Sequence, residues 1–302
     1  MPLDERAQQF LDALASLKLK PVEECTPQEA RARTTPVMGE SPAVERKQNW
    51  KLNTGSVSVP VRTYQPVGDF QSRVVFLHGG GWVFGTLDMY DQLCCWLCNT
   101  AKAEVWSVDY RLAPEHPFPA GLEDSLAVLN CALQQADGLP VVVVGDSAGA
   151  NLATVAAMEV VENTAGLYGQ VLVYPAVDCD LQRSSYQQFG EGHFLTTAMM
   201  EWFWGHYVAD PQARIQPKVS PIRSQKLARL PKSFVLTVEY DVLRDEGVEY
   251  VEALKKAGVE TEHLQAEGMI HGYLRHPNTF PQTVEHLKVI GQWIQQTCSP
   301  RK

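Results

Sequence analysis

The amino-acid sequence predicts an α/β fold in which helices flank a central, mostly parallel sheet. Short apolar runs, such as residues 74–77 and 141–144, alternate with longer helix-compatible segments along most of the chain. Such alternation is typical of parallel strands joined by crossover helices. The chain has 302 residues, of which 45% are hydrophobic and 20% are charged. It can therefore bury a core large enough for one α/β domain.

The first 48 residues are expected to cover this domain and not to enter its sheet. Residues 3–18 carry apolar side chains at alternating spacings of four and three, the pattern of an amphipathic helix. Residues 21–48 contain four prolines, which disfavour helix interiors and central strands. We therefore predict an N-terminal cap segment over residues 1–48 and the main α/β domain over residues 49–302.

The elements of the main domain follow in order. Alternating hydrophobicity predicts strands between residues 50 and 64, and an apolar run predicts one at 74–77. Further strands are expected at 104–110, 141–144, 170–174, 233–239 and 261–265, with helices at 88–101, 119–136, 245–257 and 282–296. Residues 183–212 are rich in aromatic side chains but have no strand pattern. We predict a helical cap insertion there; the alternative is an ordinary helix packed on the sheet, because an aromatic stripe by itself usually indicates core.

Charge and cysteine content restrict the partners and the compartment. The formal net charge is −9 and the basic residues are scattered, which disfavours nucleic acid and anionic membranes as partners. The N-terminus has no secretory pattern, and no apolar run approaches the ~18 residues of a membrane span. Seven cysteines without a disulfide framework agree with a reducing compartment. We therefore expect a cytoplasmic protein without stable membrane association. The Cys94, Cys95 and Cys98 cluster lacks a second Cys/His pair at zinc spacing, so we expect buried thiols and no metal.

Ser147 is the candidate nucleophile. It is the centre of a GxSxG pentapeptide, residues 145–149, which lies directly between the apolar run 141–144 and a helix-compatible run. Small flanking residues let a sharp strand-to-helix turn lift the serine side chain into the open, with its amide at a helix N-terminus. This context, more than the pentapeptide itself, predicts a nucleophile elbow.

A second motif, His78 followed by three glycines and Trp82, comes directly after the strand predicted at 74–77. Successive glycines let backbone N–H groups turn toward a developing oxyanion without obstruction from side chains. The amide of Ala148 can supply a further donor. A flexible glycine loop is the alternative, which the joint occurrence with the serine motif disfavours.

A serine nucleophile needs a base and an acid that orients the base. His271 is the candidate base because it lies in a glycine-flanked loop between the last predicted strand and the last predicted helix. Asp241 is the candidate acid because it comes just beyond the strand at 233–239, and ligand-binding groups of open α/β sheets lie at the carboxyl ends of strands. Asp245 is better placed as a helix N-terminal carboxylate. Asp146, beside the nucleophile, is assigned to local hydrogen bonding.

Together these motifs resemble the hormone-sensitive lipase family, which includes the family IV bacterial carboxylesterases with a GDSAG sequence. The resemblance covers nearly the whole chain and rests on HGGGW (78–82), DYRLAPEHPFPA (109–120), GDSAGAN (145–151), SPI (220–222), YDVLRDEG (240–247) and HGY (271–273). It implies an α/β-hydrolase fold with a helical cap and ester hydrolysis without a cofactor. It also implies a triad of Ser147, Asp241 and His271 with oxyanion donors at Gly79, Gly80 and Ala148. Val242 stands where many family members carry proline.

The expected function is that of a serine carboxylesterase acting on small-molecule esters of short to medium acyl chain through an acyl-enzyme. The bulky side chains of Trp82, Trp202 and Trp204 are the expected substrate-binding residues, because they would fill space that a long chain needs. An amide hydrolase of the arylformamidase kind and a lipase would use the same triad, and both stay open. A non-catalytic small-molecule receptor is disfavoured because all three triad residues are present. A homodimer stays open, because the sequence does not reveal the oligomeric state.

Overall fold

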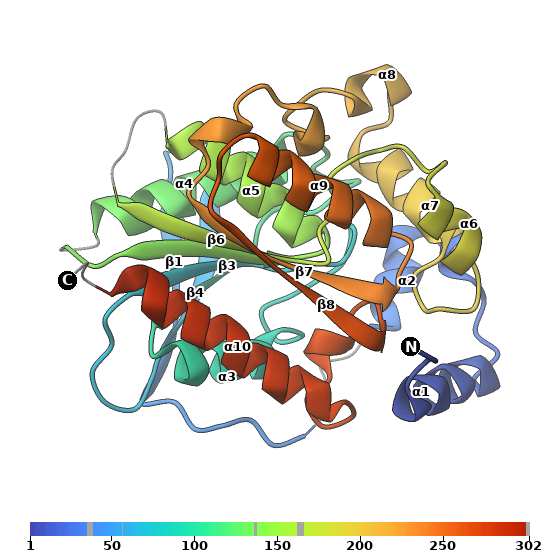
Figure 1. Ribbon diagram of the computed structural model, residues 1–302, viewed down its shortest axis with the longest axis horizontal. Helices are drawn as coiled ribbons and strands as arrows, with labels where there is room; N and C mark the ends of the chain where they lie inside the picture. The colour runs from blue at the N-terminus through green and yellow to red at the C-terminus, as the bar shows by residue number, and fades with distance from the viewer. Residues whose placement is uncertain (35–38, 56, 136–137, 162–165, 300–302) are drawn as a thin grey trace.

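The computed structural model describes residues 1–34, 39–55, 57–135, 138–161 and 166–299. Within these residues, eight strands form one sheet in the order β1-β2-β4-β3-β5-β6-β7-β8 (Figure 1). The strands are β1 (Arg46–Asn53), β2 (Ser58–Gln65), β3 (Arg73–Leu77), β4 (Glu104–Val108), β5 (Val141–Asp146), β6 (Leu167–Val173), β7 (Lys232–Tyr240) and β8 (Thr261–Ile270). Strands β3 to β8 pair in parallel, whereas β1 and β2 are antiparallel. The predicted α/β class, with a mostly parallel sheet, is confirmed.

The central strands are apolar because helices cover both of their faces. Every residue of β3, β4 and β5 is buried, as expected for parallel strands between two helical layers. The edge strand β1 is mostly exposed and polar. The prediction that residues 1–48 stay outside the sheet is wrong for 46–48, because β1 begins at Arg46. Residues 46–49 have no hydrophobic pattern, and their position follows from antiparallel pairing with β2, in which Val59 and Val61 are buried.

Two helical layers enclose the sheet. Helices α3 (Asp91–Ala101) and α10 (Pro281–Cys298) cover one face, and α4 (Ala120–Gln134), α5 (Ala148–Val160) and α9 (Arg244–Lys256) cover the other (Figure 1). As predicted, Cys94, Cys95 and Cys98 are free thiols buried in α3. In the described part of the chain, no helix is long and apolar enough to cross a bilayer.

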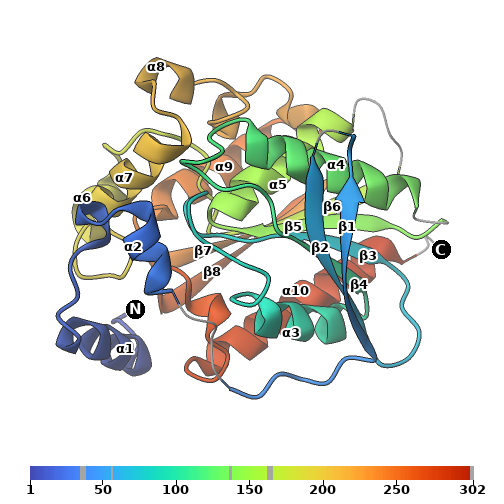
Figure 2. The ribbon, with the colours of Figure 1, turned by 180° about the vertical axis from the view of Figure 1, so that it is seen from behind.

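Most of the remaining helices lie beyond the carboxyl ends of the parallel strands (Figure 1), whereas the 3-10 helix Leu227–Arg229 directly precedes β7. The remaining helices are α1 (Glu5–Ser16), α2 (Pro27–Ala32), α6 (Ser184–Phe189), α7 (Thr197–Tyr207) and α8 (Pro211–Arg214), with short 3-10 helices η1 (Val22–Glu24), η2 (Pro221–Arg223), η3 (Leu227–Arg229) and η4 (Tyr273–Arg275). Figure 2 shows α2 beside α6 and α7, with α1 below α2. Arg31 of α2 attaches the N-terminal segment to the main domain: its Nε donates to the carbonyl of Val83 at 2.8 Å, and its Nη1 and Nη2 bind Glu115.

Candidate active site

Ser147 lies on the sharp turn between β5 and α5. Its backbone adopts φ +55° and ψ −121°, a conformation that L-residues rarely adopt and that signals stored strain. Two flanking glycines make the turn sterically feasible, since a Cβ at Gly145 would collide with the carbonyl of Gly149, and a Cβ at Gly149 would collide with that of Leu77. A hydrogen bond of 2.8 Å from Ser147 N to Val173 O fixes the turn against β6.

The structure brings the three predicted triad residues together. The Nε2 of His271, in the turn after β8, lies 3.0 Å from Ser147 Oγ. Its Nδ1 lies 2.6 Å from Oδ2 of Asp241, which follows β7. With the imidazole proton on Nδ1 held by Asp241, Nε2 is free to accept the serine proton. The arrangement can therefore activate the hydroxyl group of Ser147 as a nucleophile.

The loop that carries the acid is firmly held. Asp241 is 1% exposed, whereas Ser147 and His271 are each 7% exposed, so the nucleophile and the base can be reached while the acid is enclosed. Asp241 Oδ1 accepts a hydrogen bond from Leu243 N at 3.0 Å. Val242, at the position where the resemblance expects proline, is fully buried, and its carbonyl accepts a 2.6 Å bond from Ser185 Oγ of α6. The hydrogen bond to Ser185 thus restrains the acid loop without a proline.

Asp146 makes local hydrogen bonds, as predicted, and is not part of the triad. Its Oδ1 accepts from the backbone N–H of Gly79 at 2.7 Å, and its Oδ2 accepts from the hydroxyl groups of Tyr90 at 3.1 Å and Tyr174 at 3.4 Å. Burial raises the pKa of this carboxyl group, while the nearby charge of Arg275 and the hydrogen bonds oppose that shift. Asp146 therefore anchors the glycine loop to the turn that carries Ser147.

The same contact corrects one expected oxyanion donor. The N–H of Gly79 already donates to Asp146, so it is not available to a substrate oxygen. Gly80, Gly81 and Ala148 line the pocket beside Ser147, whereas Gly79 does not. In the described residues, the N–H groups of these three make no hydrogen bond. Gly81 was missed because a run of glycines does not reveal which amide faces the nucleophile; it has φ +60° and Gly80 has φ +116°.

Comparisons with known proteins agree with this geometry. A family model described as the alpha/beta hydrolase fold matches residues 74–275, a range that includes the whole triad. The chain belongs to this family. Ethyl acetate hydrolase of Pseudomonas putida is 34% identical over 250 residues, which are 79% of each protein. Arylacetamide deacetylase of Bos taurus is 30% identical over 288 residues, 72% of each. A crystal structure of a thermostable esterase from Pseudomonas putida aligns with a TM-score of 0.93 at 32% identity, covering 99% of both chains.

These relatives confirm the resemblance to the hormone-sensitive lipase group and show that the protein is an α/β-hydrolase enzyme. Its candidate active site opens into a cavity of about 280 Å³ that includes Ser147 and His271. Apolar side chains from two regions line the cavity: Leu19, Val22 and Ala30 precede the sheet, and Phe194, Met199 and Phe203 belong to the insertion after β6.

The three expected substrate-binding tryptophans differ in position. Trp82 lines the cavity, but Trp202 and Trp204 do not. Trp204 is fully buried behind Trp82, with ring centroids 4.5 Å apart, and Trp202 packs against His206 at 4.3 Å. Successive residues of a helix point about 100° apart. Because α7 turns Met199, Met200 and Phe203 toward the cavity, its two tryptophans face elsewhere.

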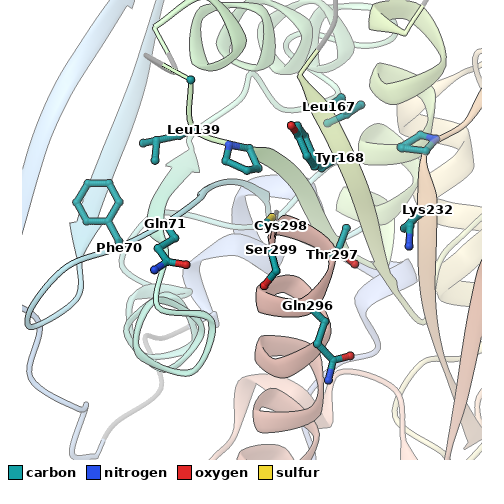
Figure 3. A pocket seen from close by; sticks show the side chains of 13 residues that line it. Phe70, Gln71, Leu139, Leu167, Tyr168, Lys232, Gln296, Thr297, Cys298 and Ser299 are labelled. Atoms are coloured by element: carbon teal, nitrogen blue, oxygen red, sulfur yellow. The ribbon is translucent and has the colours of Figure 1, made fainter. Parts of the chain in front are cut away.

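A larger hollow of about 990 Å³ lies at the opposite edge of the sheet (Figure 3). It is lined by Leu139, Leu167 and Lys232, near the amino ends of β5, β6 and β7, and by Gln296 and Ser299 at the end of α10. Ligands of open parallel sheets bind at the carboxyl ends of the strands, and none of the triad residues lines this hollow. The smaller cavity is therefore the candidate active site of this α/β hydrolase.

Proposed function

We propose that this α/β hydrolase is a serine carboxylesterase for esters of short to medium acyl chain. The observation that carries the proposal is the continuous set of contacts from Asp241 through His271 to Ser147, with distances of 2.6 and 3.0 Å. Ser147 and His271 face a cavity that also exposes backbone donors. Three relatives reported above are an ester hydrolase, a deacetylase and an esterase, which supports ester hydrolysis.

The proposed reaction has two acyl-transfer steps. His271 Nε2 takes the proton of Ser147 as Oγ attacks the ester carbonyl, and the amides of Gly80, Gly81 and Ala148 stabilise the tetrahedral oxyanion. The intermediate collapses, and the imidazolium returns the proton to the departing alkoxide, which leaves as the alcohol. Water then attacks the acyl-enzyme with His271 again as base, and release of the carboxylic acid restores the serine hydroxyl.

We also propose that the N-terminal segment before β1 and the insertion near 183–212 together form a cap that limits acyl length. Both regions contribute apolar side chains to the cavity wall. A cavity of about 280 Å³ is near the lower end of the ~300–1,000 Å³ usual for ligand pockets. Each CH₂ that enters an apolar pocket contributes about 0.8 kcal/mol until the pocket is full, so the benefit of a longer acyl chain should stop early.

Amide hydrolysis is the second candidate, because one relative is named arylacetamide deacetylase. A lipase acting on long-chain substrates is less well supported, since the cavity is small and the bulky side chains of Phe194 and Met199 line it. The same triad and oxyanion donors would serve all three reactions, so the preference depends on the leaving group and on the acyl chain.

One panel of substrates tests the proposal. Dissolved nitrophenyl esters of increasing acyl length should show the highest kcat/KM between roughly two and eight carbons. Matched nitroanilides should react more slowly, because the aniline nitrogen leaves less readily than the phenolate oxygen. Ser147→Ala should abolish turnover, whereas the control Ser184→Ala, at an exposed position of α6, should retain it. Faster anilide turnover would favour the amidase, and an optimum at palmitate length would favour the lipase.

We further propose that the enzyme works in a reducing compartment such as the cytoplasm. All seven cysteines are free, and six of them are buried, as is usual where thiols are kept reduced. Cell fractionation of the untagged protein tests this proposal, and recovery from an oxidising compartment would contradict it.

A further inference from the structure

Arg275 brings a positive charge that has no carboxylate within ion-pair distance to the wall of the active-site cavity. It ends η4, four residues after His271, and lines the same cavity as Ser147. Its guanidinium lies over the ring of Tyr90, 5.2 Å from the centroid. In the described part of the chain, its buried Nε has no hydrogen-bond partner, and no carboxylate lies within ion-pair distance. The cavity therefore contains a cationic donor with unused hydrogen-bonding capacity.

Asp146 accepts no hydrogen bond from Arg275. Its carboxylate already accepts from Gly79, Tyr90 and Tyr174, so it acts on Arg275 only through space. Burial lowers the pKa of Arg275, but the nearby oxygens of Tyr90 and Asp146, together with a side-chain interaction with the Tyr90 hydroxyl group, raise it above its ordinary value. The side chain thus stays charged, and a buried charge with an unpaired N–H group and no direct ion pair is unfavourable. A negatively charged part of a bound ligand would supply that partner.

The other charged side chains around the cavity also favour a negatively charged ligand. Lys20 and Arg33 also line it, and Arg33 Nη1 donates to the carbonyl of Lys20 at 2.6 Å, which holds the two residues near each other. Asp146 is the one acidic side chain among the described lining residues. The net charge of the whole chain is −9, so this basic lining is a local departure. A cleft lined by one sign of charge attracts ligands of the opposite sign.

We propose that the active site selects esters that also carry a carboxylate, and that Arg275 binds that carboxylate. The planar guanidinium fits a carboxylate through two parallel N–H···O bonds, while Lys20 and Arg33 attract the anion to the entrance. This inference rests on the proposed esterase function and specifies its substrate class. The carboxylate can belong to the acyl part, as in a hemiester of a dicarboxylic acid, or to the alcohol part, as in an acylated hydroxy acid.

Paired substrates separate the two sources of the carboxylate. Ethyl hydrogen succinate is compared with ethyl succinamate, and 2-acetoxypropanoate with 2-acetoxypropanamide, so that each pair differs only in carboxylate against carboxamide. The measured quantity is the ratio of kcat/KM for the charged ester to that for the neutral one. We expect this ratio to exceed about ten for at least one pair, and Arg275→Gln to lower that ratio at least about tenfold, as for loss of a charge-assisted hydrogen bond.

Control variants distinguish charge recognition from a structural role. Arg275→Lys should keep part of the preference, and Arg46→Gln, at an exposed position of the remote edge strand β1, should keep all of it. A ratio near one for both pairs in the unmutated enzyme, or an equal loss on charged and neutral esters in Arg275→Gln, would overturn the inference. Neutral esters would still be hydrolysed in either case, whereas failure to hydrolyse any ester would instead remove the proposed function.

Inhibition of the unmutated enzyme gives a second test that does not depend on the folding of a variant. Succinate and butanoate have the same chain length and share one carboxylate, which either could place at the oxyanion donors. Succinate has a second carboxylate that can reach Arg275. We expect succinate to inhibit neutral-ester hydrolysis at a concentration at least about tenfold lower than butanoate, with the difference reduced by salt. Equal inhibition would contradict the inference.

Discussion

The carboxylate of Asp146 accepts a 2.7 Å hydrogen bond from the backbone N–H of Gly79. Through this contact the residue next to the nucleophile fixes the loop that supplies two candidate oxyanion donors, Gly80 and Gly81. The same carboxylate binds Tyr90 and Tyr174, and the ring of Tyr174 lies 4.5 Å from that of His271. One buried carboxylate thus connects the turn of the nucleophile with the oxyanion loop and, through Tyr174, with the ring of the base.

Asp146→Asn should therefore reduce kcat by disturbing the hydrogen bonds that hold the oxyanion loop. An amide can still accept the bond from Gly79, but its NH₂ group would face the hydroxyl groups of Tyr90 and Tyr174 instead of accepting from them. We expect a loss of about 10²-fold in kcat, the scale of losing one oxyanion donor. Steady-state kinetics on protein with a native circular dichroism spectrum provide the check. A kcat within twofold of the unmutated value would show that the anchor is dispensable.

Asp241→Asn should keep the fold and lose about 10⁴-fold in kcat, because an amide favours the wrong imidazole tautomer of His271. Asp245→Asn is the matched control. Asp245 accepts from Ser185 N at 2.8 Å and pairs with Arg244, away from the triad, so its loss should change kcat less than about tenfold. The opposite ranking would make Asp245 the triad acid.

Phe203→Ala should shift the acyl-length optimum toward longer chains. Phe203 lines the cavity and its ring packs against Gly81, so truncation opens space for additional methylenes. Trp204→Ala, one residue away but buried behind Trp82, should instead cost about 3–5 kcal/mol of stability and leave the optimum unchanged. The measurement is the ratio of kcat/KM for decanoyl and butanoyl esters. A shift in Trp204→Ala alone would restore the original assignment of that tryptophan.

The buried imidazole of His78 should cause the free energy of unfolding to decrease in mild acid. It is fully buried between Tyr90 and Tyr110, and burial lowers its pKa from 6.5 to about 4. Because the unfolded chain binds the proton more tightly, the free energy of unfolding decreases as pH falls from about 6.5 toward 4. Between pH 7 and pH 5, urea unfolding should show a decrease about 2 kcal/mol larger in the unmutated protein than in His78→Gln. Equal decreases would mean that His78 is not protonated on unfolding.

The sequence predicted the parts of the site that lie at ends of strands. Ser147, Asp241 and His271 follow β5, β7 and β8, and parallel strands bring their carboxyl ends to one edge, so their proximity follows from the order of elements. The order of strands and helices does not determine in which direction an individual N–H group or side chain points. Whether Gly79 or Gly81 faces the nucleophile depends on the φ and ψ angles of the loop.

Side-chain directions in the cap were equally hard to predict. The sequence alone does not distinguish the three consecutive aromatic residues Trp202, Phe203 and Trp204. Only the rotation of α7 about its axis determines that Phe203 faces the cavity. Arg275 was overlooked because a single arginine in a loop carries no motif. The one sequence feature that points to Arg275 is its position four residues after His271. The turn of η4 brings its side chain back to the wall of the cavity.

The most direct measurement is the site of covalent labelling. An organophosphonate or sulfonyl fluoride reacts fast only with a serine that has an activating base and oxyanion donors, so peptide mass mapping should find a single adduct at Ser147. His271→Ala should label much more slowly, and esterase activity should decline in proportion to the adduct. Loss of activity with the label on Cys94, Cys98 or any residue other than Ser147 would contradict the account.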